Sequence, residues 1–586
     1  MLKVLRRLSA RELLVVAVCL ALTVAQTWLD LELPDYMEEI TRVLQTPDGT
    51  MSDIWSAGVG MLLITLASAA TAVLVGLLGA RLAAGFSMRL RSDIFTRVSD
   101  FSMEEINSFS TASLITRTTN DITQVQMLIA MGLQVVIKAP IMAVWALAKV
   151  SAGSWEWLTL TGGSVVSLVV IIASVMSYAH PRFRRIQTLT DNITRVTREN
   201  LTGIRVVRAY NAEEYQEQKF EQANEDLTDN NLAVHRVMAV FNPCMRLIMS
   251  GLTLGIYWIG AFLIESAALS DKAVVFSEMI VFSQYATQVL MSFMMLTMIF
   301  VMGPRVAVSA KRINEVLDTV PKLRDGAASS SPEGVRGDVE FRGVSFRYPD
   351  AEDYVLRDIS FTARGGETVA FIGSTGSGKS TLINLVPRFY DATEGQILID
   401  GVDVREYTQE ALRKKIGYIP QRAVMFTGDV TSNIAFGDSA GGEAIPEDVS
   451  RAAMTAQAAD FIEDMDGGYS ALVSQGGTNI SGGQKQRLSI ARAIYRDPEI
   501  LVFDDSFSAL DYRTDRELRA ALKRDTHGVT SLIVAQRIGT IRDADRIIVL
   551  DDGLLVGSGT HDELMRDCEV YREIAYSQLS REELGA

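Results

Sequence analysis

The chain has 586 residues, 48% of them hydrophobic, and a formal net charge of −15 at pH 7. This length corresponds to about four average domains, so several structural units are expected. The acidic balance argues against nucleic acid as a partner, because neutralising phosphates requires a basic surface. The three cysteines, Cys19, Cys244 and Cys568, show no paired spacing and support neither a disulfide framework nor a zinc site.

Six apolar runs occupy the first part of the chain, and each is long enough to cross a hydrocarbon core of about 30 Å as a helix. Residues 1–323 are therefore predicted to form an all-α transmembrane domain with six spans in a lipid bilayer. An even number of spans leaves both ends of this domain on one side. The predicted spans are residues 13–29, 54–80, 127–149, 157–179, 240–264 and 273–303.

The distribution of Lys and Arg predicts that both termini are cytoplasmic, because membrane insertion leaves these residues in cytoplasmic loops. Five Arg lie in residues 81–126 and nine Lys or Arg in residues 180–239, whereas the opposite side holds only three. The acidic segment 30–53 is predicted to be an external loop. We expect a multi-pass protein of the plasma membrane. A cleaved signal peptide is the alternative for the first span, but five further spans need that span to set their topology.

The two inner segments, residues 81–126 and 180–239, are longer than a helix connection needs and keep helical periodicity. The spans are therefore predicted to continue beyond the bilayer as amphipathic helices. Polar stretches near residues 111–121 and 211–220 are expected at the tips of these extensions.

Residues 324–337 are rich in Ser, Gly and Pro and mark a linker. From residue 338 to 586, short β-branched runs alternate with helical ones, which predicts an α/β domain. The expected fold class is thus multidomain, with an all-α transmembrane domain, a linker and an α/β nucleotide-binding domain.

A phosphate-binding loop lies between a strand predicted at residues 367–372 and a helix predicted at residues 379–390. Its glycines let backbone N–H groups turn onto phosphate, and the N-terminus of the helix adds positive potential. Lys379 is placed to pair with the β- and γ-phosphates and Ser380 to bind Mg²⁺, so ATP and Mg²⁺ are the expected cofactors. Small GTPases and kinases carry the same pattern, and an ordinary Gly/Ser turn is the plainer alternative. The predicted cofactor-binding residues of this loop are Gly373, Ser374, Thr375, Gly376, Ser377, Gly378, Lys379, Ser380 and Thr381.

A pair of acids, Asp504 and Asp505, follows an apolar run at residues 500–503 that is predicted to be a buried strand. Such a strand aims its terminal acids at the phosphate pocket, and the first acid is placed to hold Mg²⁺ through water. Asp504 is therefore a predicted metal ligand together with Ser380. Capping of the next helix is the alternative role for such a pair.

The segment ISGGQKQR, residues 480–487, lies between these two motifs and resembles the signature of ATP-binding-cassette (ABC) proteins. With six spans followed by a cassette, the whole chain is similar to an exporter-type ABC half-transporter. In that family the signature caps the γ-phosphate of ATP held by a facing cassette, so the resemblance implies a second half-transporter as partner. A Gly-rich helix cap is the alternative. The residues that match the signature are Ser481, Gly482, Gly483 and Gln484.

Three further residues match the family in chain order. The resemblance implies that Tyr348 stacks on adenine and that Gln421, in the Q-loop, contacts the metal and takes part in catalysis. It also implies that Asp511, in the D-loop, belongs to the nucleotide site. Simple packing is the alternative for Tyr348. Residues 474–479 are similar to the exporter segment that touches the inner loops of the membrane domain.

Two residues at predicted catalytic positions depart from the family pattern. Asp505 stands where the family usually has Glu, and Gln536 where it usually has His. A general base must lie within about 3 Å of the attacking water. Asp505 is one methylene shorter than Glu, and a misplacement of about 1 Å can cost on the order of 10²-fold in rate. Gln536 can hydrogen-bond to phosphate but cannot change its charge near neutral pH as imidazole does.

These departures lead to the hypothesis that the chain is the degenerate half of a heterodimeric exporter and holds ATP more than it splits it. The partner would be a different chain with Glu and His at the matching positions. The signature of this chain would then complete the hydrolytic site of the partner. The alternatives are a homodimer in which Asp505 is a slower base, a siderophore-type importer, and a membrane ATP sensor that transports nothing.

Candidates for contact with a hydrophobic or amphipathic substrate lie in the spans. Glu278 is a candidate for contact with a cationic substrate. Lys138 and Arg246 are charges inside predicted spans, for which snorkelling to the inner interface is the favoured alternative. A Gln and Met stripe on the sixth span has the adaptable side chains of promiscuous sites, and packing is its alternative. This stripe consists of Gln284, Gln288, Met291, Met295, Met298 and Met302.

Overall fold

A computed structural model describes residues 2–45, 50–151, 154–268, 271–332, 334–437 and 444–578. The chain divides into two compact units. The membrane unit comprises Met1–Ser99 and Ala112–Thr319, and the cassette unit comprises Asp100–Thr111 and Val320–Ala586.

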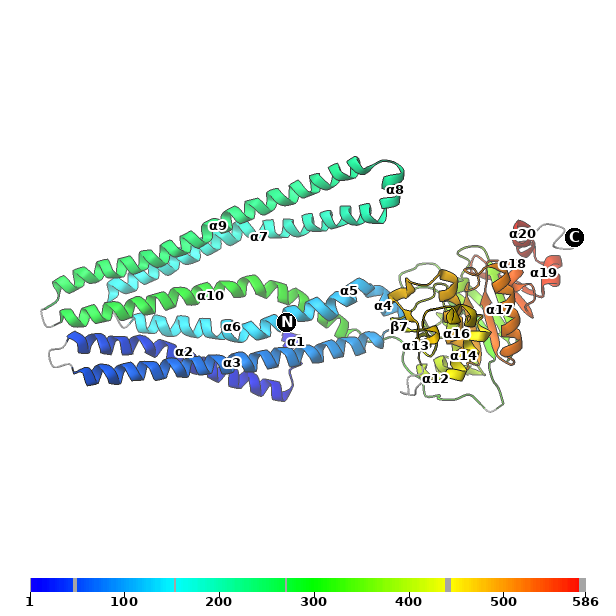
Figure 1. Ribbon diagram of the computed structural model, residues 1–586, viewed down its shortest axis with the longest axis horizontal. Helices are drawn as coiled ribbons and strands as arrows, with labels where there is room; N and C mark the ends of the chain where they lie inside the picture. The colour runs from blue at the N-terminus through cyan, green and yellow to red at the C-terminus, as the bar shows by residue number, and fades with distance from the viewer. Residues whose placement is uncertain are drawn as a thin grey trace. The chain divides into compact units, whose positions relative to one another are not determined.

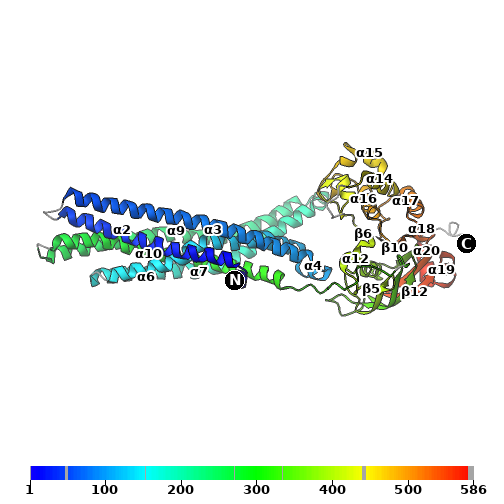
Figure 2. The ribbon, with the colours of Figure 1, turned by 90° about the horizontal axis from the view of Figure 1, so that it is seen from below.

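Six long helices make up most of the membrane unit and lie side by side as extended rods (Figures 1 and 2). In the described part of the chain, all six are long and apolar enough to cross a membrane, as predicted. Large apolar side chains such as Leu62, Leu66 and Val73 are more than half exposed, which suits a lipid environment. The helices, with the short N-terminal α1 (Leu2–Leu5), are α2 (Ala10–Gln45), α3 (Met51–Ser99), α6 (Ile122–Ser151), α7 (Trp155–Thr202), α9 (Glu213–Ser266) and α10 (Lys272–Asp318).

The prediction of an external loop at residues 30–53 was wrong for most of that segment, because α2 continues without a break to Gln45. Two partly buried acids of this segment form ion pairs with lysines of α6. Asp30 forms an ion pair of 2.8 Å with Lys138 of α6, and Asp35 forms one of 2.6 Å with Lys149. These pairs let the helix carry acids between apolar neighbours, since a paired charge costs far less to bury than an isolated one.

A third helix joins the same polar group, which we call the polar seam (Asp30, Asp35, Lys138, Lys149 and Tyr285). The Tyr285 hydroxyl of α10 donates to Asp35 and lies 3.0 Å from the Leu31 carbonyl oxygen. Lys138, for which snorkelling is the favoured alternative from the sequence, forms its ion pair with Asp30 of α2. Arg246 is exposed.

The tips of the inner extensions lie earlier in the chain than predicted. The first tip is α4 (Met103–Phe109), followed by α5 (Thr111–Thr116) and the π-helix η1 (Arg117–Asp121), and the second is α8 (Ile204–Ala209). A capping box at Ser102, with Glu105 three residues later, starts α4, and this signal was present in the sequence. α4 belongs to the cassette unit, where Asn107 donates to the Tyr390 hydroxyl at 3.1 Å.

Two sheets build the cassette unit. One is antiparallel, with the strand order β2-β1-β4-β5, and the other has the order β12-β11-β3-β10-β9-β6. In the second sheet, the neighbours from β11 to β6 are all parallel, and β12 is antiparallel at the edge. The strands are β1 (Val339–Phe346), β2 (Leu356–Ala363), β3 (Thr368–Gly373), β4 (Glu394–Ile399), β5 (Val402–Asp403), β6 (Ile416–Ile419), β9 (Ile500–Asp504), β10 (Thr530–Val534), β11 (Arg546–Asp551) and β12 (Leu554–Gly559), with a small pair β7 (Gly428–Asp429) and β8 (Leu472–Val473).

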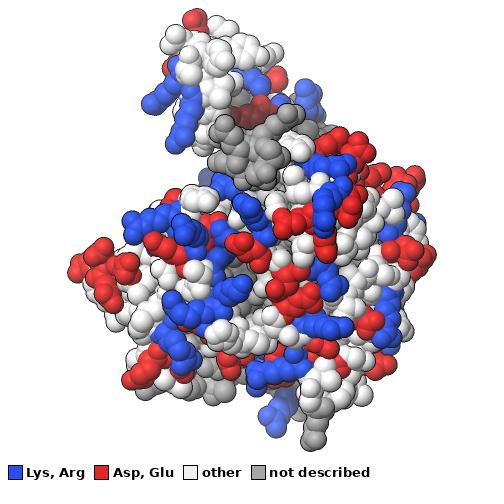
Figure 3. Space-filling model, turned by 90° about the vertical axis from the view of Figure 1, so that its right-hand side faces the viewer, with Lys and Arg blue, Asp and Glu red and all other residues white. Residues whose placement is uncertain are grey.

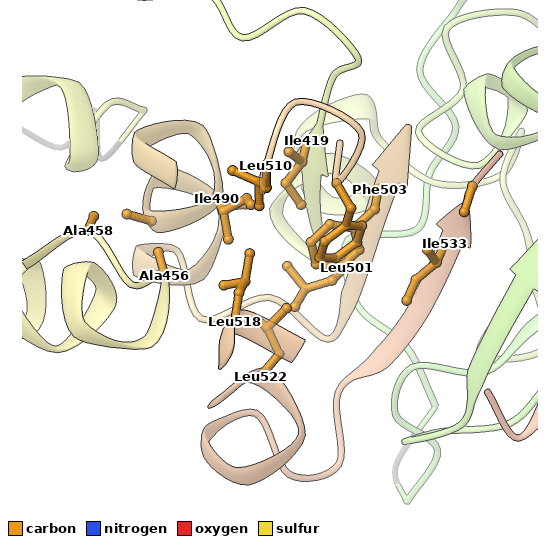
Figure 4. Close-up of a cluster of buried hydrophobic side chains, with 14 of the residues drawn as sticks. Ile419, Ala456, Ala458, Ile490, Leu501, Phe503, Leu510, Leu518, Leu522 and Ile533 are labelled. Atoms are coloured by element: carbon orange, nitrogen blue, oxygen red, sulfur yellow. The ribbon is translucent and has the colours of Figure 1, made fainter. Parts of the chain in front are cut away.

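Helices cover the parallel sheet and bury its apolar side chains. Figure 4 shows Leu501 and Phe503 of β9 and Ile533 of β10 beside side chains of α16 and α17. Alternate residues of the same strands, such as Val502 and Leu532, belong to a second core cluster, as expected for a sheet buried on both faces. The cassette helices are α11 (Lys379–Leu385), α12 (Gln409–Lys414), α13 (Val430–Ile434), α14 (Pro446–Thr455), α15 (Ala459–Glu463), α16 (Gly482–Tyr495), α17 (Tyr512–Asp525), α18 (Ile538–Ile541), α19 (His561–Asp567) and α20 (Glu569–Gln578).

The helix predicted at residues 379–390 is shorter in the structure, because α11 ends at Leu385. Pro387 accounts for this end, since a proline has no backbone N–H to continue the helical hydrogen bonding. On the face of the molecule seen in Figure 3, Lys and Arg side chains are interspersed with Asp and Glu and form no continuous basic field.

Candidate nucleotide-binding site

The candidate site lies where four neighbouring strands of the parallel sheet end. β3 runs into the P-loop at Gly373, and β9 ends at Asp504. β10 lies between them and is followed by Gln536, while β6 lies on the other side of β9 and leads to Gln421. Because parallel strands point the same way, their carboxyl ends bring these segments to one edge. The topology thus unites residues spread over more than 160 positions of the sequence.

The P-loop has a backbone that requires glycine at specific points. Gly376 and Gly378 have φ values of +88° and +94°, in the left-handed region that other residues avoid. The Cβ of any other residue at position 373 would collide with the Leu550 carbonyl oxygen. The loop can therefore curl closely enough to direct backbone N–H groups onto a phosphate.

Lys379 is held by neutral oxygens in the described chain. Its Nζ donates to the carbonyl oxygens of Gly373 at 2.9 Å and Ser374 at 2.7 Å, and more weakly to the Ser377 hydroxyl at 3.3 Å. Burial lowers the pKa of this ammonium, and the nearby Asp505 opposes that shift. Because all three of these acceptors are neutral, Lys379 suits the binding of a phosphate anion.

The residues predicted to hold Mg²⁺ also meet. Ser380 donates its hydroxyl to Asp504 Oδ1 at 2.7 Å, and Asp504 is almost fully buried. Burial raises the pKa of Asp504, while hydrogen bonds from Ser380 and Tyr418 act against this shift. A serine hydroxyl and one carboxylate are hard oxygen ligands, and Mg²⁺ commonly binds such a small protein set together with phosphates. The donor set therefore fits Mg²⁺ bound with ATP.

The two residues that depart from the family pattern are in direct contact. Gln536 Nε2 donates to Asp505 Oδ2 at 2.7 Å, and Gln421 Nε2 donates to the same oxygen at 3.3 Å. We call these three residues the amide clamp. Burial raises the pKa of Asp505, and the hydrogen bond from Gln421 is the largest effect against it. No motif in the sequence indicates that both glutamines share one carboxylate oxygen.

The backbone at Asp505 also favours aspartate. Its φ is +47°, in the left-handed region where Asp and Asn are more common than other non-glycine residues. Its backbone N–H donates to the Val534 carbonyl oxygen at 3.0 Å, which fixes the turn after β9. The residue that approaches the phosphate pocket is thus held by its backbone as well as by the clamp.

The signature residues form the start of α16. Ser481 is the N-cap, with its backbone N–H donating to Gln484 Oε1 at 2.8 Å and its hydroxyl accepting from Gln484 N at 3.3 Å. Gly482 and Gly483 supply the first turn without side chains. Within the described chain, no hydrogen bond joins these four residues to the P-loop, Asp504 or Asp505. Ser481 and Gly482 are exposed.

Two further predicted residues, Tyr348 and Asp511, make contacts that do not by themselves indicate a role in nucleotide binding. Tyr348 bonds to the Thr381 hydroxyl at 3.0 Å, and its ring meets those of Phe346 and Tyr390 edge to face. Asp511 is the N-cap of α17 and accepts from Thr514 N at 2.9 Å. The contacts of Tyr348 fit the packing alternative, and those of Asp511 show a helix cap. The adenine and D-loop roles remain proposals.

Tyr418 on β6 is a site residue that the sequence did not single out. Its hydroxyl donates to Asn384 Oδ1 at 2.9 Å and lies 3.5 Å from Asp504 Oδ2. The only signal in the sequence was a polar aromatic residue in the otherwise apolar strand IGYI. Nothing in that strand alone shows which neighbour the hydroxyl meets.

Comparisons with known proteins agree with this architecture. Residues 16–293 match the family described as ABC transporter transmembrane region, and residues 356–508 match the family described as ABC transporter. An uncharacterised ABC transporter ATP-binding protein of Mycobacterium tuberculosis is 40% identical over 96% of each chain. An ATP-dependent lipid A-core flippase of Pseudomonas fluorescens is 34% identical over 84% of this chain and 81% of its own.

Among solved structures, a bacterial Atm1-family ABC exporter with ATP bound superposes with a TM-score of 0.78. The alignment covers 98% of this chain and 100% of that one, at 25% sequence identity. The similarity therefore includes the helix bundle and the cassette together.

Proposed function

This chain belongs to the ABC transporter family, and from that premise we propose that it is the degenerate half of a heterodimeric exporter. The family and the fold establish an ATP-driven, multi-pass membrane transporter that uses ATP with Mg²⁺. In such a pair, the pocket of this chain mainly binds ATP, while hydrolysis occurs in the pocket of a different partner chain.

The amide clamp is the observation that carries the proposal. A general base needs a free carboxylate oxygen within about 3 Å of the attacking water. Oδ2 of Asp505 instead accepts hydrogen bonds from Gln536 and Gln421. The two donors occupy this oxygen where the attacking water would bind, and the shorter aspartate side chain also limits its reach. Both effects act against hydrolysis in this pocket.

The residues expected to bind phosphate and Mg²⁺ all match the family pattern. Lys379 is held by neutral acceptors, and Ser380 and Asp504 form a ligand pair that fits Mg²⁺. Bound Mg²⁺ would supply charge neutralisation for the phosphates. The complete signature at the start of α16 would close the ATP site of the partner, which is expected to carry Glu and His where this chain has Asp505 and Gln536.

The cargo is proposed to be hydrophobic or amphipathic. One relative is named as a lipid A-core flippase, and the exposed faces of Gln284, Met291 and Met295 on α10 offer adaptable contacts. Met298 and Met302 lie outside the described side chains. The excess of Lys and Arg in the inner segments supports a cytoplasmic location for the cassette and both termini.

The test compares the chain alone with the chain paired to its partner, both in lipid nanodiscs. The chain alone should bind ATP with Mg²⁺ but hydrolyse it at least about 10²-fold more slowly than the pair. The double substitution D505E and Q536H should add hydrolysis to the pair, whereas D505E alone should add less, because Gln536 would still engage the carboxylate. Hydrolysis by the unaltered chain alone at the rate of the pair would refute the proposal and favour an active homodimer.

A further inference from the structure

The second oxygen of the Mg²⁺-binding carboxylate has its own neighbour. Asp504 Oδ1 accepts from Ser380 at 2.7 Å, and Oδ2 lies 3.5 Å from the hydroxyl of Tyr418. The same hydroxyl donates to Asn384 Oδ1 at 2.9 Å. Its single proton thus faces two acceptors, one neutral and one anionic.

The fold places Tyr418 firmly. β6 pairs in parallel with β9, with Tyr418 opposite Val502, two residues before Asp504. The ring of Phe389 packs edge to face on Tyr418 with centroids 5.2 Å apart. Asn384 lies on α11, one helical turn after Ser380, so the phenol connects β6, β9 and the helix that follows the P-loop.

We propose that Tyr418 is a positioning residue that orients the Asp504 carboxylate for Mg²⁺. The inference rests on the proposed Mg²⁺ site but is independent of the proposed heterodimer. Rotation of the Asp504 carboxylate is limited when Oδ1 accepts the proton of Ser380 and the Tyr418 hydroxyl, which shares its proton with Asn384, lies beside Oδ2. Groups that hold metal ligands in this way commonly contribute 10–100-fold to metal affinity.

Asn384 gives the proposal a discriminating control. Without its amide oxygen, the Tyr418 hydroxyl can give its proton to Asp504 alone. N384A should therefore preserve or tighten metal binding, whereas Y418F should weaken it. If the Tyr418–Asn384 bond only braced β6 against α11, both variants would lose the same bond and change in the same direction.

The experiment measures Mn²⁺ binding to the full chain in nanodiscs at saturating ATP, by electron paramagnetic resonance of free Mn²⁺. Y418F should bind Mn²⁺ about 10-fold more weakly, while its affinity for ATP in EDTA stays unchanged. Y407F is a matched control, because it removes a buried hydroxyl of the same unit that bonds the Ile399 carbonyl oxygen at 3.1 Å. It should leave Mn²⁺ binding unaltered.

Two results would overturn the assignment of Tyr418. One is Mn²⁺ affinity of Y418F within about twofold of the wild type, and the other is an equal loss in Y418F and N384A. A wild-type chain that binds no ATP in EDTA or with metal would instead contradict the proposed nucleotide site itself. The two failures are therefore distinguishable.

Discussion

The polar seam of the membrane unit and the nucleotide pocket of the cassette unit both contain partly or fully buried charged side chains, but these charges have different partners. In the seam, each acid has its own base, at 2.8 Å for Asp30 and Lys138 and 2.6 Å for Asp35 and Lys149. In the pocket, Lys379 and Asp504 are held by carbonyl and hydroxyl oxygens. The seam charges are matched within the fold, whereas the pocket charges remain available to a ligand.

This difference separates two roles of buried charge. A matched pair stabilises the arrangement of the helices that carry it, and breaking it leaves an uncompensated charge. A charge whose hydrogen-bond partners are neutral is not cancelled by them, so it still attracts an ion of opposite sign. The same type of substitution should therefore affect folding in one region and binding in the other.

The largest expected effect comes from breaking the seam with Lys138→Met. The loss of its base leaves Asp30 uncompensated, which should destabilise the membrane unit by about 3 kcal/mol. The measurement is thermal unfolding in nanodiscs followed by tryptophan fluorescence. All six tryptophans lie before residue 259, so the signal reports the membrane unit.

A charge exchange is the control for this substitution. The double variant D30K and K138D keeps both charges and should recover part of the lost stability. Equal melting temperatures for the wild type and K138M would show that the ion pair contributes nothing, and the contrast between the two regions would fail.

The matching substitution in the pocket, Lys379→Met, should have the opposite profile. Burial disfavours the charged form of this lysine, as its lowered pKa shows, so its removal should change stability by less than about 1 kcal/mol. ATP affinity should fall by about 10²-fold, because charge-assisted hydrogen bonds to phosphate are lost. Equilibrium binding of a fluorescent ATP analogue measures this loss, and substantial unfolding of K379M would contradict the assigned role.

The two regions also differ in how far the sequence predicted them. The P-loop could be predicted because its glycines and Lys379 are consecutive and each has a local physical reason. The seam could not, because Asp30 and Lys138 are 108 positions apart and their pairing depends on how α2 and α6 pack. Without that pairing, an acidic stretch after an apolar run was assigned to a loop.

Within the pocket too, individual contacts between residues far apart in the sequence could not be predicted. The motifs predicted that Asp504, Asp505 and Gln536 matter, since each follows a strand in the expected order. They did not predict that Gln536 reaches Asp505, because that contact depends on the register between β9 and β10 and on the turn at φ +47°. The capping boxes at Ser102 and Ser481 can be recognised from neighbouring residues in the sequence. The box at Ser102 indicates a helix that starts there, which would have moved the predicted tip of the first inner segment to the correct residues.

A smaller effect is expected from opening the amide clamp with Gln536→Ala. Asp505 would lose its hydrogen bond of 2.7 Å and keep only the longer one from Gln421. The free carboxylate should raise hydrolysis by the paired transporter by less than about 10-fold, because the shorter reach of aspartate remains. Phosphate release from the pair measures this change. A loss of ATP binding in Q536A would show that Gln536 serves the nucleotide rather than the clamp.

The smallest expected effect is the pH dependence of Asp505→Asn in the ligand-free chain. Burial raises the pKa of Asp505 above its ordinary value of 3.8, so the folded state binds its proton more tightly than the unfolded state. The stability contributed by wild-type Asp505 should therefore fall as pH rises through this window. D505N lacks this dependence and should gain stability relative to the wild type as pH rises from 4 to 7. Hydrogen exchange of β9 and β10 amides, compared at each pH, measures the difference, and a gain that instead grew toward low pH would show that Asp505 is stabilised in its ionised form.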